Sequence, residues 1–264
     1  GEPIVLLHGN PTWSFYYRRL IADLRRRYRV IAPDHMGCGF SDKPQRYQYT
    51  LAQHIANLEA LVARLGLPRF TLVMHDWGGA IGMGYATRHP DTVARFVVLN
   101  TAAFWVPRFM PLRLRLCLIP VVGEWAIRRF NLFARLALTM ACQHQERMTR
   151  EVRAGYLAPY DSYANRIATV RFVQDIPRTQ AHPSYRTLEA IEQGLAQLTR
   201  HPMLIIWGAR DPVFTNLVLR SWQERFPHAI VKSLEDAGHY VMEDACERII
   251  PWVNEFLESH STVR

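Results

Sequence analysis

Short apolar runs alternate with amphipathic stretches along most of the chain. Short, mainly apolar runs predict strands at residues 3–7, 28–32, 70–74, 96–99, 203–207 and 230–234. The runs at 3–7 and 96–99 are apolar throughout, which is typical of strands buried on both faces. Helical periodicity separates them, at about residues 14–27, 50–66, 77–88, 188–198, 217–225 and 244–257. Strands that alternate with helices predict a parallel sheet with helices on both faces.

The middle of the chain breaks this rhythm. Residues 104–185 contain no strand of this kind, and their Pro, Arg and aromatic content differs from that of the flanks. We therefore expect a helical cap at 104–185, inserted between a first core segment at 1–103 and a second at 186–264.

Charge is concentrated in the same region. The chain has a formal net charge of +9, and residues 104–180 hold 12 Arg against 5 Asp or Glu, which accounts for +7 of it. No nucleic-acid module and no stacking pattern of aromatics accompanies these arginines, so a solvated basic face or a docking surface is expected, and no nucleic acid. No apolar window approaches the roughly 18 residues of a membrane span, so no transmembrane segment is expected.

The cysteines give no sign of a metal site or a disulfide framework. Cys38, Cys117, Cys142 and Cys246 lie far apart without paired spacing. A reducing, cytoplasmic setting is expected, with no metal and no organic cofactor.

Chemically active residues follow four of the predicted strands. Asn10, Asp76, Asp211 and His239 each come soon after a strand, and the carboxyl ends of parallel strands meet at one edge of a sheet. Asp76 stands between a strand and a helix, followed by Trp77 and two glycines, which is the pattern of a nucleophile elbow with Asp in place of Ser. A carboxylate is ionised at neutral pH and can displace a leaving group from a saturated carbon, forming an ester.

The remaining groups suit the breakdown of such an ester. His239 is the candidate general base and Asp211 the acid that orients it, in the chain order of α/β-hydrolases. The backbone N–H groups of Trp77 and Asn10 are candidate oxyanion donors, and the Asn10 amide and Trp77 indole could bind a leaving anion. Simpler interpretations stay open: Asp76 as a helix N-cap, Asp211 as the start of a turn, Trp77 as pocket wall, and Asn10 as a brace of its own turn.

These motifs together resemble the haloalkane dehalogenase-like α/β-hydrolases, third subfamily, over nearly the whole chain. The motifs are residues 8–13 (HGNPTW), 34–42 (DHMGCGFSD), 75–79 (HDWGG), 208–211 (GARD) and 236–239 (DAGH). The resemblance implies an α/β-hydrolase fold with Asp76 as nucleophile, Asp211 as acid, His239 as base, and Asn10 and Trp77 as leaving-group donors. Asn100 occupies the place where another subfamily carries the acid. Family members have two strands before the one at residues 3–7, so we expect the strand near 28–32 to lie at a sheet edge.

Within this family, residues 10–18 (NPTWSFYYR), 99–104 (LNTAAF) and 156–162 (YLAPYDS) look most like the β-lactone decarboxylases of long-chain olefin biosynthesis. That likeness implies conversion of a dialkyl β-lactone to a cis-alkene, and assembly with other pathway enzymes, for which the basic cap would be a docking surface. The alternatives are a haloalkane dehalogenase, an epoxide hydrolase using a cap tyrosine such as Tyr156, Tyr160 or Tyr163, and an inactive scaffold.

A small hydrophobic substrate needs an apolar pocket. We expect that pocket to be lined by Phe104, Trp105, Phe109, Phe172 and Tyr240. Other aromatics of the insertion are expected on its inner face, among them Phe130, Phe133, Tyr156 and Tyr160.

Overall fold

The computed structural model describes residues 1–106 and 122–261 and contains one six-stranded sheet. All strand pairs are parallel, in the order β2-β1-β3-β4-β5-β6. The strands are β1 Pro3–Leu7, β2 Arg29–Ile31, β3 Phe70–His75, β4 Val93–Leu99, β5 Met203–Gly208 and β6 Ile230–Leu234. The predicted α/β-hydrolase sheet is thus confirmed, and the strand bounds differ from the expected ones by up to three residues.

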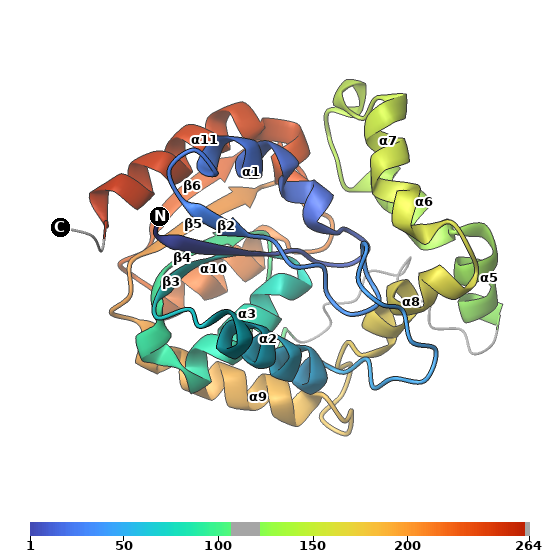
Figure 1. The fold of residues 1–264 in the computed structure, drawn as a ribbon, viewed down its shortest axis with the longest axis horizontal. Coiled ribbons are helices and arrows are strands. Elements are labelled where there is room, and N and C mark those ends of the chain that lie inside the picture. The colour runs from blue at the N-terminus through green and yellow to red at the C-terminus, as the bar shows by residue number, and fades with distance from the viewer. Residues whose placement is uncertain (107–121, 262–264) are drawn as a thin grey trace.

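Helices cover both faces of the sheet (Figure 1). One face packs against α1 (Arg18–Leu24) and α11 (Val241–Ser259). The other packs against α2 (Leu51–Leu65), α3 (Trp77–Arg88), α9 (Tyr185–Gly194) and α10 (Asn216–Arg225). Successive side chains of a strand point to opposite faces, so each apolar strand contributes to two cores at once.

Local signals explain several helix ends. The Thr50 hydroxyl accepts a hydrogen bond from the Gln53 backbone N–H, which is the expected N-cap of α2. The Gln53 side chain bonds Asn57 instead of turning back, so only half of the capping box forms. Gly66 ends α2 in the left-handed conformation that glycine adopts at low cost. The last helix begins at Val241, three residues earlier than expected, because two helices join across non-helical Ala245.

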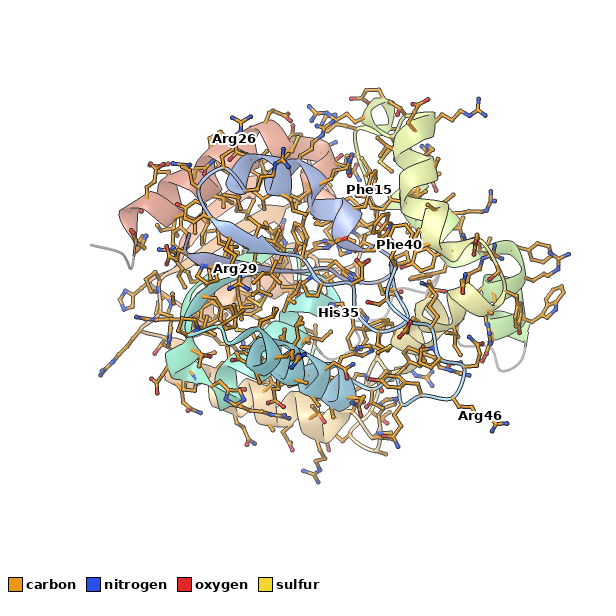
Figure 2. All side chains as sticks on the ribbon, viewed as in Figure 1. Phe15, Arg26, Arg29, His35, Phe40 and Arg46 are labelled. Atoms are coloured by element: carbon orange, nitrogen blue, oxygen red, sulfur yellow. The ribbon has the colours of Figure 1, made fainter. Side chains whose placement is uncertain are left out.

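β2 lies at one edge of the described sheet, as the sequence predicted, and pairs only with β1. It is three residues long. Two exposed arginines lie at its start, Arg26 in the preceding turn and Arg29 as the first residue of the strand, and both are labelled in Figure 2. A short strand with positive charge on its edge is a poor template for pairing with another chain.

Among the described residues between β4 and α9, the regular secondary structure is helical. They form α5 (Val122–Phe130), α6 (Leu132–Met140), α7 (Arg150–Leu157) and α8 (Ile167–Gln174), joined by short 3₁₀ turns. These four helices gather on the side of the molecule opposite the two termini (Figure 1). No helix of the described residues is long and apolar enough to cross a membrane.

Candidate active site

Asp76 sits on a strained turn between β3 and α3. Its φ of 50° and ψ of −126° are unusual for a non-glycine residue, and such strain costs on the order of 1–3 kcal/mol. The turn needs the two glycines that follow. A Cβ at Gly78 would lie 2.1 Å from the Leu7 carbonyl oxygen, and one at Gly79 would lie 2.0 Å from Oγ1 of Thr101. The sequence therefore forces the close approach of strand and helix that turns Asp76 outward.

Backbone donors hold one side of the Asp76 carboxylate. Oδ1 accepts the Asn10 backbone N–H at 2.8 Å, and the Trp77 backbone N–H also bonds the carboxylate. Burial raises the pKa of Asp76, while the charge of His239 and these two N–H groups act in the opposite direction. Gly9 makes this arrangement possible, because a Cβ there would lie 2.2 Å from Oδ1.

The other carboxylate oxygen faces the imidazole. Oδ2 of Asp76 is 3.7 Å from Nε2 of His239, and Nδ1 of His239 is 2.8 Å from Oδ2 of Asp211. Burial lowers the pKa of His239, and the charges of Asp211 and Asp76 together outweigh it, so the net direction is upward. His239 thus lies between two carboxylates, with one ring nitrogen toward each.

Asp211 is the most firmly held of the three groups. Its Oδ1 accepts the backbone N–H groups of Val213 at 2.6 Å and Phe214 at 3.0 Å. Its Oδ2 accepts the Asn100 side-chain amide at 2.9 Å in addition to the imidazole. Four donors around one buried carboxylate fix its orientation. The simpler interpretation of Asp211 as the start of a turn is also true, since Oδ1 bonds the turn that follows.

An apolar cavity of about 580 Å³ opens above Asp76. Asn10, Asp76, Trp77 and His239 line it, together with Phe104, Trp105 and Tyr240, which the sequence predicted. Helix α6 supplies Phe133, Leu136, Ala137 and Met140, and the remaining lining residues are mostly aliphatic or aromatic. Phe109 lies outside the described residues. An apolar cavity above a single carboxylate suits a substrate that is a hydrocarbon apart from its reactive group.

Two aromatic residues differ from the expected placement. Phe172 is not among the described lining residues: its ring packs 5.1 Å from Trp77 and stacks 4.5 Å from His54, so it supports Trp77 from behind. Phe130 is more than half exposed instead of facing inward. Periodicity cannot separate these cases, since short helices that pack on two sides are apolar on more than one face.

The two candidate anion donors differ in their surroundings. Nδ2 of Asn10 donates to the Thr169 carbonyl oxygen at 3.1 Å, which ties the turn after β1 to α8. The second N–H of that amide is left for a ligand. Trp77 is half-buried in the cavity wall, and its indole N–H has no hydrogen-bond partner among the described residues.

Three groups that the sequence analysis did not single out complete the site. They are Gly9, the Thr169 carbonyl, and Thr101, whose hydroxyl bonds the carbonyl oxygen of Asp76. Thr101 and Thr169 come from segments 25 and 159 residues away from the groups that they contact, so the local sequence does not show these contacts.

The chain belongs to the α/β-hydrolase fold family, whose model matches residues 2–245, and it is an enzyme of that family. It is 44% identical over 268 residues to a cis-3-alkyl-4-alkyloxetan-2-one decarboxylase from Shewanella oneidensis, covering 100% of this chain and 84% of that protein. A decarboxylase of the same name from Xanthomonas campestris is 42% identical over 98% of this chain and 89% of its own length. A haloalkane dehalogenase 2 from Mycobacterium tuberculosis is 34% identical over 94% of this chain and 85% of its own length.

Solved structures of haloalkane dehalogenases share the fold of this chain. Haloalkane dehalogenase DbeA from Bradyrhizobium elkani superposes with a TM-score of 0.89 at 26% identity, covering 100% of this chain and 92% of that chain. DatA from Agrobacterium tumefaciens gives 0.87 at 26% identity, with coverage of 99% and 90%. In sequence, the chain is thus more similar to the two decarboxylases than to haloalkane dehalogenase 2 from Mycobacterium tuberculosis.

Proposed function

We propose that the protein decarboxylates a cis-β-lactone carrying two alkyl chains to a cis-alkene, through an ester on Asp76. One observation carries the proposal: a carboxylate held by backbone N–H groups faces an apolar cavity of about 580 Å³. The 44% and 42% identity to proteins named as cis-3-alkyl-4-alkyloxetan-2-one decarboxylases supports the choice of substrate class.

In the first step, Oδ2 of Asp76 attacks the saturated, alkyl-bearing ring carbon that is bonded to the ring oxygen. Oδ1 is occupied by the Asn10 backbone N–H, so Oδ2 is the free nucleophile. The carbon–oxygen bond of the ring breaks, and its electrons leave with the ring oxygen, which becomes part of a carboxylate. The Asn10 amide and the Trp77 indole are donors for this new anion, and no proton has to move.

In the second step, the carbon–carbon bond to that carboxylate breaks. Its electrons form the alkene, the ester bond to Oδ2 breaks, and carbon dioxide and free Asp76 result. Backside attack inverts the carbon and places Oδ2 opposite the carboxylate, so an anti elimination gives the cis product. His239, 3.7 Å from Oδ2, is positioned as the imidazolium that stabilises the returning negative charge.

A haloalkane dehalogenase is the second candidate, favoured by the free Trp77 indole N–H beside the Asn10 amide. A halide would leave toward these donors, and the ester would be hydrolysed by a water that His239 activates, with Asp211 orienting the imidazole. In this reaction His239 acts in its neutral form. The two candidates thus share the ester and differ in how it breaks.

An epoxide hydrolase has less support. The Tyr156 hydroxyl donates to Glu243 and the Tyr160 hydroxyl to the Thr12 carbonyl, and neither ring lines the cavity among the described residues. Tyr163 is 45% exposed at the surface. These tyrosines therefore do not offer a proton to an opening ring oxygen at Asp76.

Turnover in H₂¹⁸O separates the two leading candidates. Decarboxylation consumes no water, so wild-type enzyme given a cis-3,4-dialkyl β-lactone should release alkene and carbon dioxide and leave Asp76 unlabelled. Hydrolysis of an alkyl ester places ¹⁸O in the Asp76 carboxylate, which peptide mass spectrometry detects. Lactone turnover without alkene, or with ¹⁸O in Asp76, would overturn the decarboxylase proposal.

A trapping experiment tests the ester itself. The His239→Gln variant given a 1-bromoalkane should accumulate an adduct of the alkyl mass on the intact chain, because attack needs no base and hydrolysis does. Asp76→Asn is the matched control and should give no adduct. An adduct on another residue would remove Asp76 from the proposed role.

A further inference from the structure

The outer face of α5 and α6 carries large apolar side chains in contact with solvent. Trp125, Phe130, Leu132 and Leu136 are between 41% and 54% exposed. The rings of Trp125 and Phe130 meet edge to face at 5.4 Å, and the guanidinium of Arg129 lies 5.6 Å from the Phe130 ring centre. Trp125 and Phe130 therefore meet at the junction of the two helices, and together with the exposed Leu132 and Leu136 of α6 we call them the apolar cluster.

Helix α6 is apolar on both sides. Leu132 and Leu136 are exposed one turn apart, and Arg135 is exposed beside them. The opposite side holds buried Ala134 and Leu138. Leu136 also lines the cavity, so the outer apolar cluster continues into the wall of the candidate active site. A helix in water normally keeps its outer face polar, and this one does not.

Positive charge surrounds the cluster. Among the described residues, Arg129 and Arg135 have no carboxylate partner. The guanidinium of Arg166 donates to backbone carbonyls, including that of Arg129 at 3.1 Å. Burial lowers the pKa of Arg166, and the charges of Arg135 and Arg129 add to the effect, which reflects how close the three cations lie.

The acidic residues of this region do not cancel the charge. Asp161 raises the pKa of Arg166, but the net direction is downward. Glu124 of α5 already pairs with Arg128 at 3.0 Å and with Arg171 at 3.1 Å. We define the α5–α6 surface by its apolar and cationic members: Trp125, Phe130, Leu132, Leu136, Arg129, Arg135 and Arg166. It combines exposed aromatic and aliphatic side chains with two arginines, Arg129 and Arg135, that have no carboxylate partner among the described residues.

We propose that the α5–α6 surface binds the surface of an anionic phospholipid bilayer. Trp125, Phe130 and Leu132 enter the headgroup region, and Arg129 and Arg135 contact lipid phosphates. Aromatic and leucine side chains beside arginines are the composition of helices that lie in a membrane interface, and each arginine near an anionic surface strengthens such binding about fivefold. The proposal stands on the surface alone and does not depend on the reaction at Asp76.

The position of the α5–α6 surface would let a bound membrane deliver substrate to the cavity. These helices form the end of the molecule that lies away from both termini (Figure 1), so they can meet a flat bilayer without obstruction from the sheet. Through Leu136, the cavity wall adjoins this end. An apolar substrate dissolved in lipid would then reach the cavity without crossing water.

Vesicle co-sedimentation of the full chain tests the proposal. We expect binding to vesicles of phosphatidylcholine with 30% phosphatidylglycerol, and at least tenfold weaker binding to phosphatidylcholine alone or to anionic vesicles at high salt. The pair Arg129→Gln and Arg135→Gln should remove the preference for anionic lipid. The pair Trp125→Gln and Leu132→Gln should weaken binding at least tenfold, and neither residue lines the cavity.

Matched controls separate this surface from general charge and apolarity. The pair Arg64→Gln and Arg69→Gln removes two exposed arginines elsewhere, and Leu217→Gln removes an exposed leucine of α10; both should bind as wild type does. Trp125→Phe should keep binding but lose part of the quenching of tryptophan fluorescence by brominated lipid. Circular dichroism and substrate turnover without vesicles confirm that each variant is folded.

Three results would overturn the proposal. They are binding no stronger to anionic than to zwitterionic vesicles, equal loss in the control variants, and an unquenched Trp125 in bound protein. A second copy or a partner enzyme on the same surface is the remaining outcome. In that case, sedimentation velocity would give the wild-type protein a larger mass than one chain, and the Trp125→Gln and Leu132→Gln pair would lower it. Wild-type protein would then not bind vesicles, and the membrane proposal would be wrong.

Discussion

Nδ2 of Asn100 lies 2.9 Å from Oδ2 of Asp211, the same oxygen that lies 2.8 Å from Nδ1 of His239. Asn100 directly follows β4 and has a φ of 27°, and its own Oδ1 accepts the backbone N–H of Gly208 at 2.8 Å. One buried amide thus joins the ends of β4 and β5 and holds the acid that orients the imidazole. Asn100 therefore positions the carboxylate of Asp211. Its own side chain lies close enough to Asp211 that an acid at position 100 could take over that role.

This proximity predicts that the acid that orients His239 can be moved from position 211, after β5, to position 100, after β4. Asp211→Asn should lower turnover by about 10³–10⁴-fold, because the imidazole loses the partner that fixes its tautomer and stabilises its charge. Adding Asn100→Asp to that variant places a carboxylate beside the same nitrogen and should restore at least tenfold. Steady-state kinetics on the lactone and on a 1-bromoalkane measure both changes.

The single variant Asn100→Asp is the control for this experiment. It puts two carboxylates within hydrogen-bonding distance, where like charges raise the pKa of one of them, and turnover should become more dependent on pH. A double variant no more active than Asp211→Asn would show that Asn100 cannot present an acid to His239.

Gly9 is predicted to be indispensable for activity and not for folding. A Cβ at this position would lie 2.2 Å from Oδ1 and 2.5 Å from Cγ of Asp76, so Gly9→Ala must displace the carboxylate from its donors. Displacement of about 1 Å costs on the order of 10² in rate, and we expect kcat to fall by at least that factor. Gly66→Ala is the control: it meets no neighbour but has a φ of 59°, so the melting temperature should fall and kcat should not. Wild-type kcat in Gly9→Ala would contradict the geometry.

Most of the candidate site could be predicted from the residues in the turns that follow the strands. Asp76 directly follows the buried strand β3, and Asp211 and His239 lie in the turns after β5 and β6. A parallel sheet brings such turns together whatever the rest of the chain does. Within that edge, His239 lies 2.8 Å from Asp211 and 3.7 Å from Asp76. The position of β2 at an edge was predicted from the family resemblance, because family members have two strands before the one at residues 3–7.

Contacts between distant segments were beyond the sequence patterns. The bond from Asn10 to the Thr169 carbonyl joins residues 159 positions apart, and nothing near Asn10 specifies it. Phe172 and Phe130 both sit among apolar neighbours in the sequence, yet one supports Trp77 from behind and the other faces solvent. Packing between helices decides such cases, and single-helix periodicity does not encode it.

Tyr240 is predicted to act on the lactone and not on a haloalkane. Its ring is buried in the cavity wall, and its hydroxyl has no hydrogen-bond partner among the described residues. Burial raises the pKa of this hydroxyl, and the charge of Asp76 contributes, so it stays a donor. A carboxylate formed from the lactone can accept from it. Tyr240→Phe should therefore lower kcat/KM for the lactone about tenfold and change bromide release less than twofold. Equal effects on both substrates would assign Tyr240 a packing role.

Acid should destabilise the fold through a group of buried histidines. His8, His35 and His54 lie on one side of the site, with the His8 and His35 rings 4.4 Å apart. Burial lowers the pKa of His8 to about 4 and those of His35 and His54 to about 3. The unfolded chain binds protons on these residues below pH 6.5, and the native state does not until about pH 4. Stability therefore falls as pH drops through this window, by up to about 1.4 kcal/mol per pH unit for each histidine.

His54 offers a clean test, because both of its ring nitrogens lack partners among the described residues and its ring stacks on Phe172. Urea unfolding of His54→Leu between pH 7 and 5 should show a shallower loss of stability than wild type, by up to about 1.4 kcal/mol per pH unit. His239 contributes with the opposite sign, since its pKa is raised, but it is unchanged in both proteins and cancels. The exposed His228, replaced by Gln, should leave the wild-type slope intact. An equal slope in His54→Leu and wild type would mean that His54 already carries its proton in the folded state.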